Sequence, residues 1–371
     1  MILPRPEHVS PRRQSPRRWL KGFLLALLLA LPMAAFAAAG TSWWCTMLPF
    51  LPACAAAPGG GGGGGANNGA LTEVSGFGTN PGALRMFTYR PANLAAGRPL
   101  VVALHGCTQQ ASSYDDETGW IKFADKHRFA LLLPQQQQAN NLSKCFNWFL
   151  PGDNERDKGE ALSIRQMIDR IKMDAGSDPQ QIYITGLSGG GAMTAVMLAT
   201  YPELFAGGAI LAGVPYKCAN DANEALSQCG VSLSGQLVPT KDLAPAQWGS
   251  LVRSASSHTG ALPRVSIWQG SADKTVNPLN QQELVDQWTN VLGIDATPDT
   301  SDTLQGHAHK VYKDSSGKAL LETVLIDAMG HGTPVGPGHL DNECGQAAPF
   351  ILNVGVCSSF HIVRFWGLDQ P

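Results

Sequence analysis

The stretch Gln181–Met193 reads QIYITGLSGGGAM, and it indicates the fold class more directly than any other part of the sequence. Its first five residues, QIYIT, predict a strand, and residues 192–201, rich in Ala, Met and Leu, predict a helix. Between them, residues 186–190 (GLSGG) match the pattern G-x-S-x-G. In a strand–turn–helix context this pattern makes a sharp, strained turn, for which small flanking residues leave room. We therefore predict that Ser188 projects its hydroxyl above a sheet, as a nucleophile.

A glycine-rich turn can also bind phosphate, or simply let a helix pack closely on a strand. Residues 186–191 lack the glycine spacing and the lysine of a P-loop, so phosphate binding is not expected here. The strand before the turn and the helix after it favour the nucleophile.

Buried strands alternate with helices along the chain in both directions from this turn. Apolar runs predict strands at 84–89, 99–104, 129–133, 181–185, 207–211, 265–269 and 321–326, the third stopped by Pro134. Helical spacing of apolar residues predicts helices at 112–128, 159–175, 192–201, 280–292 and 359–366. Such alternation is typical of an α/β fold with a mostly parallel central sheet and helices on both faces. These sheets bind their ligands at the carboxyl ends of the strands.

The composition excludes several classes of protein. The 371 residues are 44% hydrophobic and 15% charged, enough apolar content for one large domain or two modest ones. A formal net charge of −2 argues against a nucleic-acid partner bound through a basic surface. Eight cysteines are too dilute for a disulfide-only miniprotein. Because the sequence has no CxxC pair or His/Cys cluster, we expect no metal and no other cofactor. No feature indicates an oligomeric state.

Residues 1–37 have the pattern of a secretory signal peptide. Six basic residues precede the uncharged run FLLALLLALPMAAFAAA at 23–39, and the small-x-small triplet at 35–37 marks a cleavage site. An uncleaved membrane anchor, a twin-arginine signal at 17–18 and a lipoprotein box ending at Cys54 are the alternatives. Removal of residues 1–37 leaves 21 basic and 28 acidic residues, a net charge of −7. We expect a secreted protein, extracellular or periplasmic, with no membrane span after cleavage.

The glycine-rich composition of residues 38–70 predicts a flexible tether. One folded domain is expected over 71–371. The tether contains Cys45, Cys54 and seven consecutive glycines at 59–65. Glycine loses more backbone entropy on ordering than any other residue, so this segment gains little from folding.

A serine hydroxyl becomes a strong nucleophile only when a base takes its proton. His331 directly follows the expected strand 321–326, in a glycine-containing loop, and is the predicted base. His339, also in a glycine-proline loop, is the reserve candidate.

The imidazole in turn needs an acid that orients it. Asp273 lies on the loop after the expected strand 265–269 and is the predicted acid; the alternative is an ordinary turn or helix-capping aspartate. Its rival, Asp327, is too near His331 in sequence to face it easily. The chain order Ser188, Asp273, His331 is the order of α/β-hydrolases.

The tetrahedral intermediate of acyl transfer needs two backbone N–H donors for its oxyanion. Gly189, the residue after the nucleophile, is the first expected donor. The second is Cys107, in the His105-Gly106-Cys107 loop after the expected strand 99–104. His105 is expected to hold that loop in place and not to take part in catalysis.

Six segments form a recognisable set: LHGCTQ (104–109), CFNWF (145–149), GLSGGGAM (186–193), G-x-x-D-x-x-x-x-P (270–278), GHGTPVG (330–336) and CGQAAPFILNVGVCSSFHIVRFWGL (344–368). Together they resemble the polyhydroxybutyrate (PHB) depolymerase family of esterases. The resemblance covers roughly residues 71–368 and implies an α/β-hydrolase fold with Ser188, Asp273 and His331 as the triad. It also implies that Cys107 and Gly189 form the oxyanion hole.

The family hydrolyses esters of hydroxyalkanoates, and related members act on feruloyl and acetyl esters of plant polysaccharides. Family members that degrade solid polymer carry a linker and a substrate-binding module after the catalytic domain, whereas this sequence ends at Pro371. The sequence therefore does not decide whether the protein attacks solid polymer. The resemblance implies a secreted serine esterase for hydroxyalkanoate esters or oligomers. The alternatives are a feruloyl or acetylxylan esterase, a peptidase with the same site, and a non-catalytic binding module.

The cysteines and aromatic residues give further expectations. Local spacing favours the disulfides Cys218–Cys229 and Cys344–Cys357. A third disulfide, Cys107–Cys145, would hold the oxyanion loop, residues 105–109. Unpaired buried cysteines are the alternative. Residues 214–260 are expected to form a small cap or plain surface structure. The candidate walls of the acyl pocket are Trp148, Phe149 and Trp248, for which core packing is the alternative.

Overall fold

The computed structural model describes residues 71–370. The signal peptide predicted at 1–37, the tether predicted at 38–70, and Cys45 and Cys54 lie outside the described residues.

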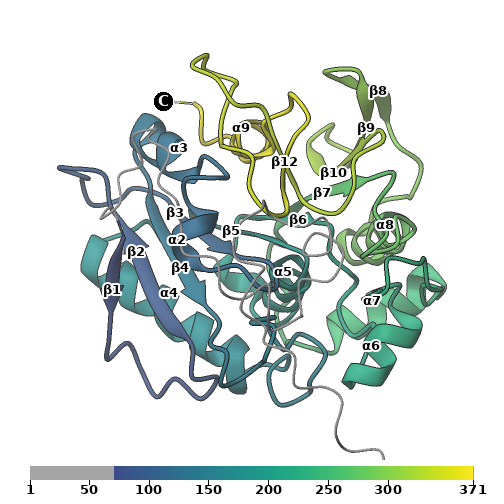
Figure 1. Ribbon diagram of the computed structural model, residues 1–371, viewed down its shortest axis with the longest axis horizontal. Helices are drawn as coiled ribbons and strands as arrows, with labels where there is room; N and C mark the ends of the chain where they lie inside the picture. The colour runs from purple at the N-terminus through teal and green to yellow at the C-terminus, as the bar shows by residue number, and fades with distance from the viewer. Residues whose placement is uncertain (1–70, 371) are drawn as a thin grey trace, which may run out of the picture. The chain divides into compact units, whose positions relative to one another are not determined.

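A ten-stranded sheet runs through the described part of the chain, in the order β1-β2-β4-β3-β5-β6-β7-β10-β9-β8 (Figure 1). The strands are β1 (Thr72–Val74), β2 (Arg85–Tyr89), β3 (Leu100–Leu104), β4 (Ala130–Gln135), β5 (Ile182–Leu187), β6 (Gly207–Leu211), β7 (Arg264–Gly270), β8 (Thr300–Leu304), β9 (His307–Lys313) and β10 (Ala319–Ile326). The six strands from β4 to β10 in this order pair in parallel. Antiparallel strands extend the sheet at both edges.

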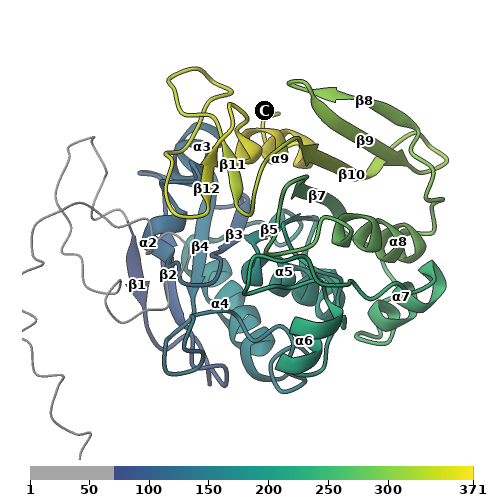
Figure 2. The same ribbon diagram turned by 45° about the vertical axis from the view of Figure 1, so that its right-hand side comes forward.

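Helices cover both faces of the sheet, because its central strands are apolar on both sides (Figure 2). Along β3, Leu100, Val102 and Leu104 enter one core, whereas Val101 and Ala103 enter the other. The helices of the first core are α4 (Gly159–Ala175), α5 (Gly189–Thr200), α6 (Ala222–Gln228), α7 (Pro245–Arg253) and α8 (Asn280–Leu292). The helices of the second core are α2 (Ala111–Tyr114), α3 (Trp120–His127) and α9 (Ser358–Trp366). The predicted α/β architecture is thus confirmed.

Two of the predicted elements were wrong in detail. The helix expected at 112–128 is two helices, α2 and α3, separated by residues 115–119, and Gly119 at the end of this break has a left-handed φ of +79°. A Cβ at position 119 would lie 2.6 Å from the Cβ of Cys344. Glycine at this position therefore leaves room for the segment that contains Cys344. The strand expected to stop before Pro134 continues to Gln135. β4 pairs with β3 only over 130–132, so the missing N–H of Pro134 costs no bond to β3.

Residues 214–260, expected to form a cap or surface structure, contain α6 (Ala222–Gln228) and α7. Val231 pairs with Val276, and the Ser232 N–H donates to the Thr275 carbonyl at 2.7 Å. This segment therefore supports the loop that carries Asp273. A small parallel pair, β11 (Thr333–Val335) and β12 (Ile351–Asn353), follows the main sheet.

Candidate active site

Ser188 lies between β5 and α5, in the turn that the G-x-S-x-G pattern predicts. Its φ of +55° and ψ of −116° form a conformation that non-glycine residues rarely adopt. Glycines make this turn sterically possible: a Cβ at Gly186 would lie 2.4 Å from the Gly190 carbonyl oxygen, and a Cβ at Gly190 would lie 2.4 Å from the Leu104 carbonyl oxygen. The side chain of Ser188 is consequently held at the carboxyl end of the central strand, where it is partly exposed.

Asp273 and His331 lie on the loops after β7 and β10, which are neighbouring parallel strands. The Nδ1–H of His331 donates to Asp273 Oδ2 at 2.7 Å. Asp273 is 1% exposed, and its carboxylate also accepts from Gln269 Nε2 (3.0 Å), Thr275 N (2.8 Å) and Val276 N (2.9 Å). These bonds fix the carboxylate and, through it, the imidazole, with Nε2 left for proton transfer.

Hydrogen bonds between adjacent strand ends bring the three loops to one edge of the sheet. Ser188 N donates to Leu211 O at the end of β6, and Ala212 N donates to Trp268 O in β7, at 2.9 Å and 2.8 Å. Ser271 N donates to Ile326 O at the end of β10 at 3.0 Å. Ser188 Oγ makes no hydrogen bond to any of the described residues. The hydrogen bond between a serine nucleophile and its base is often formed only when substrate binds.

The rival residues lie elsewhere. Asp327 is exposed, and its Oδ1 accepts from Ser271 Oγ at 3.2 Å. His339 is exposed in the loop between β11 and β12.

Cys107 and Gly189 lie against each other beside the turn of Ser188. A Cβ at Gly189 would be only 3.1 Å from Cys107 Sγ and 3.7 Å from Cys145 Cβ. Neither the Cys107 N–H nor the Gly189 N–H donates a hydrogen bond to another described residue. Two unused donors next to a nucleophile are the arrangement that an oxyanion hole requires.

His105 fixes the loop that carries Cys107. Its Nδ1–H donates to the Gly106 carbonyl at 2.7 Å, and its Nε2 accepts from Gln136 N at 3.1 Å. Burial lowers the pKa of His105 to about 4, so the ring stays neutral and can accept that bond. Gln109 ties the same loop at another point, because it accepts from Gly106 N at 2.8 Å and donates to Pro349 O at 3.1 Å.

A buried carboxyl group that the sequence analysis missed supports the segment around Cys145, the disulfide partner of Cys107. Glu160, in the first turn of α4, accepts from Asn147 N and Asn147 Nδ2, each at 2.8 Å, and from Gln136 Nε2 at 2.5 Å. Gln136 Nε2 also donates to Cys145 O at 3.1 Å. Burial, and to a smaller degree the charge of Asp153, raise the pKa of Glu160 to about 8. A buried polar cluster has no sequence periodicity that would have revealed it.

The three predicted disulfides are present: Cys107–Cys145, Cys218–Cys229 and Cys344–Cys357, with Cα–Cα distances of 4.2, 5.7 and 5.4 Å. The first joins the oxyanion loop to the segment that Glu160 holds. Among residues 71–370, no three His, Cys, Asp or Glu side chains gather in a group that could hold a metal ion.

The aromatic residues expected at the acyl pocket are placed differently from one another. Trp248 on α7 is 0% exposed, and its Nε1–H donates to Glu283 Oε2 at 2.7 Å, so it packs in the core, which was the alternative to a place in the pocket wall. Trp148 is 8% exposed and meets the half-buried Phe149 edge to face, with ring centroids 5.3 Å apart.

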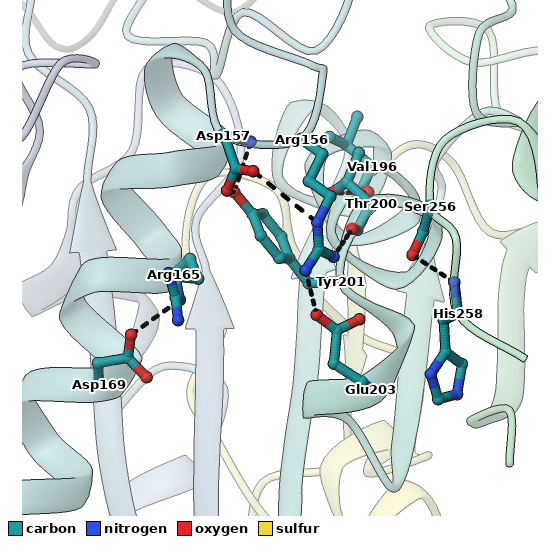
Figure 3. A network of polar contacts seen from close by, with 10 residues as sticks. All are labelled: Arg156, Asp157, Arg165, Asp169, Val196, Thr200, Tyr201, Glu203, Ser256 and His258. Carbon is teal, nitrogen blue, oxygen red and sulfur yellow. Dashed lines mark hydrogen bonds and ion pairs between the residues drawn. The ribbon is translucent and has the colours of Figure 1, made fainter. Parts of the chain in front are cut away.

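The carboxyl end of α5, the helix that begins directly after Ser188, is anchored by Arg156 (Figure 3). Arg156 Nη1 donates to the Thr200 carbonyl, and Nη2 to Glu203 Oε1, each at 2.6 Å. Its guanidinium also lies 4.6 Å from the centre of the Tyr201 ring. A cation at the carboxyl end of a helix satisfies otherwise unpaired carbonyls and favours the helix dipole. α5 is thus held at both ends.

Phe350 is a second residue that sequence reasoning missed. Its ring centroid lies 5.9 Å from that of His331, with the ring planes at 71°. The residues between Cys344 and Cys357 that bring it there carry no motif that indicates this contact.

Comparisons with known proteins find relatives among esterases. The family model described as Esterase PHB depolymerase matches residues 84–304, a range that contains Ser188 and Asp273 and ends before His331. The poly(3-hydroxyalkanoate) depolymerase C of Paucimonas lemoignei is 53% identical over 300 residues, which cover 81% of this chain and 70% of that protein. Feruloyl esterase B of Talaromyces stipitatus is 33% identical over 271 residues, covering 71% and 73%.

A solved structure, the acetyl xylan esterase from Aspergillus awamori, aligns with a TM-score of 0.65 and 25% identity, over 81% of this chain and 100% of that chain. Within residues 71–370, no helix has both the length and the apolar character needed to span a membrane.

Proposed function

The chain belongs to the esterase PHB depolymerase family and is a carboxylic ester hydrolase, and on that premise we propose that it is a serine esterase that cleaves hydroxyalkanoate esters of the poly(3-hydroxybutyrate) type. Ser188, His331 and Asp273 are its catalytic triad. The observation that carries this proposal is the 2.7 Å hydrogen bond between His331 and Asp273 at the same sheet edge as the strained turn of Ser188.

The reaction proceeds through an acyl-enzyme. His331 Nε2 takes the proton of Ser188 as Oγ bonds to the ester carbon, and the N–H groups of Gly189 and Cys107 donate to the resulting oxyanion. The protonated imidazole then gives its proton to the leaving alkoxide oxygen as the ester C–O bond breaks. A water molecule, deprotonated by His331, attacks the acyl carbon, and the returned proton restores Ser188 as the acid leaves. Asp273 keeps the imidazole in the required tautomer throughout.

The relatives support hydroxyalkanoate esters as substrates. The relative named as a poly(3-hydroxyalkanoate) depolymerase is 53% identical, whereas the relatives named as feruloyl and acetylxylan esterases are 31% to 34% identical. A feruloyl or acetylxylan esterase is the second candidate, since the aligned solved structure is an acetyl xylan esterase.

A substrate panel separates the two candidates. The purified protein is assayed on hydroxybutyrate dimers and trimers, methyl ferulate and acetylated xylan under the same conditions. We expect the highest kcat/KM on the hydroxybutyrate oligomers. A higher kcat/KM on ferulate or xylan acetate would replace this substrate with the second candidate. A fluorophosphonate probe that labels Ser188 tests the nucleophile separately from the substrate.

We further propose that the protein is secreted after cleavage near Ala37. The basic and apolar pattern of residues 1–37 supports export, and so do the three disulfides, because such bonds persist in oxidising compartments. The mass of the protein recovered from the periplasm or the medium gives its first residue. A cytoplasmic, full-length product would contradict this proposal.

A further inference from the structure

Phe350 combines exposure with a strained backbone, which is unusual for a large apolar residue. Its side chain is 36% exposed, so packing in the core does not account for it. Its φ of +63° is left-handed, a conformation in which a bulky side chain is unfavourable. Strained residues of this kind cluster at functional sites, where the surrounding structure holds them.

The structure around Phe350 holds it in that conformation. The Phe350 carbonyl accepts from Thr333 N at 2.8 Å, and Ile351 directly after it pairs with Thr333 in the β11–β12 pair. The disulfide Cys344–Cys357 closes the segment, and Gln109 Nε2 donates to the Pro349 carbonyl at 3.1 Å. Phe350 is therefore attached both to the strand that follows His331 and to the oxyanion loop.

The position of the ring relative to His331 defines which part of an ester it would meet. Asp273 occupies Nδ1 of His331, so Nε2 delivers the proton to the leaving alkoxide oxygen. The alcohol portion of the ester consequently lies beside the imidazole, whereas the acyl portion lies at Ser188 and the N–H groups of Gly189 and Cys107. The Phe350 ring meets the His331 ring edge to face, with centroids 5.9 Å apart, so it lies beside the side chain that the alcohol portion would approach.

We propose that Phe350 contacts the alcohol portion of the ester and determines selectivity for large, apolar alcohol groups. This role rests on the proposed catalytic function of His331. A hydroxyalkanoate oligomer has a large alcohol portion with an apolar alkyl part, because its leaving group is the next hydroxyacyl unit. A methyl ester has almost none, so its hydrolysis would not depend on the ring.

Two ester series test this inference. One keeps the butyryl group and varies the alcohol from methyl through butyl to benzyl; the other keeps ethanol and varies the acyl chain from acetyl to octanoyl. In Phe350→Ala we expect kcat/KM for benzyl butyrate to fall about 10-fold, the size of effect that loss of a few apolar contacts produces. Methyl butyrate and the relative rates along the acyl series should stay at wild-type values.

Two further variants separate the ring from the backbone. Phe350→Gly removes the ring and also relieves the left-handed conformation, so it should show the same loss of alcohol selectivity as Phe350→Ala. Leu340→Ala removes another exposed side chain (64% exposed) just before Cys344 and should leave both series unchanged. Equal losses on all esters in both Phe350 variants, or losses that follow acyl length, would overturn the role of Phe350.

The reaction of Ser188 with a fluorophosphonate distinguishes this failure from failure of the proposed function. Its leaving group is fluoride, which has no alcohol portion, so Phe350→Ala should react at the wild-type rate. If wild type is labelled at Ser188 and yet both variants keep wild-type alcohol selectivity, only the inference about Phe350 is wrong. If wild type is not labelled at Ser188, the proposed function fails, and the inference that depends on it fails as well.

Discussion

Asp273 Oδ2 accepts the Nδ1–H of His331 at 2.7 Å. The two residues are 58 positions apart in the sequence and follow two adjacent strands, β7 and β10. In Asp273→Asn the side-chain amide can donate to the ring and favour the wrong tautomer, while the shape of the loop is kept. We expect kcat to fall on the order of 10³- to 10⁴-fold with an unchanged fold. Asp327→Asn, at the exposed neighbouring aspartate, is the matched control and should keep wild-type kcat. The reverse pattern would make Asp327 the orienting acid.

Replacement of Ser188 by alanine removes the nucleophile and leaves the rest of the site intact. Because alanine cannot form the acyl-enzyme, turnover of a short p-nitrophenyl ester should fall by at least ~10³-fold. Circular dichroism checks that the strained turn has not unfolded the protein. Ser250→Ala, on the exposed side of α7, should retain full activity. Wild-type turnover in Ser188→Ala would remove Ser188 from the mechanism.

The parallel core and the positions of Ser188, Asp273 and His331 after its strands were predictable because their signals are local. Strands buried on both faces appear as continuous apolar runs, and ligand-binding residues follow such strands directly; Ser188, Asp273 and His331 all do so. The antiparallel edge formed by β9 and β8 was not predicted. Both strands are polar and only partly buried, as in His307–Lys313 (HAHKVYK), so no apolar run distinguishes them from a loop.

The residues that support the site depend on contacts that no local pattern records. Glu160 lies in an ordinary amphipathic helix, and only the folded chain shows that it bonds to Asn147 and Gln136. Phe350 reaches His331 through a segment closed by a disulfide. Trp248 has the same sequence signature whether it lines a pocket or packs against Glu283, so the sequence left that choice open.

The Cys107–Cys145 disulfide is expected to affect both catalysis and stability. It closes a separation of 38 residues, so its loss should lower the free energy of unfolding by about 4 kcal/mol in the chain-entropy model. In the proposed mechanism it also holds the Cys107 N–H in the oxyanion hole. Loss of one such donor lowers kcat roughly 10²-fold or more, so displacement of this N–H should lower kcat by up to that factor, with little change in KM. The double variant Cys107→Ala/Cys145→Ala is assayed by urea unfolding and by steady-state kinetics.

The matched control is Cys218→Ala/Cys229→Ala, which opens a separation of 11 residues outside the oxyanion loop. Its free energy of unfolding should fall by about 3 kcal/mol, with kcat unchanged. If both pairs lower kcat equally, the effect comes from general destabilisation and not from the oxyanion loop.

Burial of His105 should make the stability of the protein fall in acid. The unfolded chain binds a proton at this histidine near its ordinary pKa of 6.5, whereas the folded protein does so only at about 4. Between these values the unfolded state holds more protons, so the free energy of unfolding decreases as pH falls from 6.5 to 4, by roughly 3 kcal/mol for this group.

His105→Gln cannot take up that proton and should have a shallower pH profile in urea unfolding. The carboxylates titrate in both proteins, so the difference between the two profiles isolates His105. His339→Gln, at an exposed histidine, should keep the wild-type slope, and parallel profiles for wild type and His105→Gln would mean that His105 is not held neutral by burial.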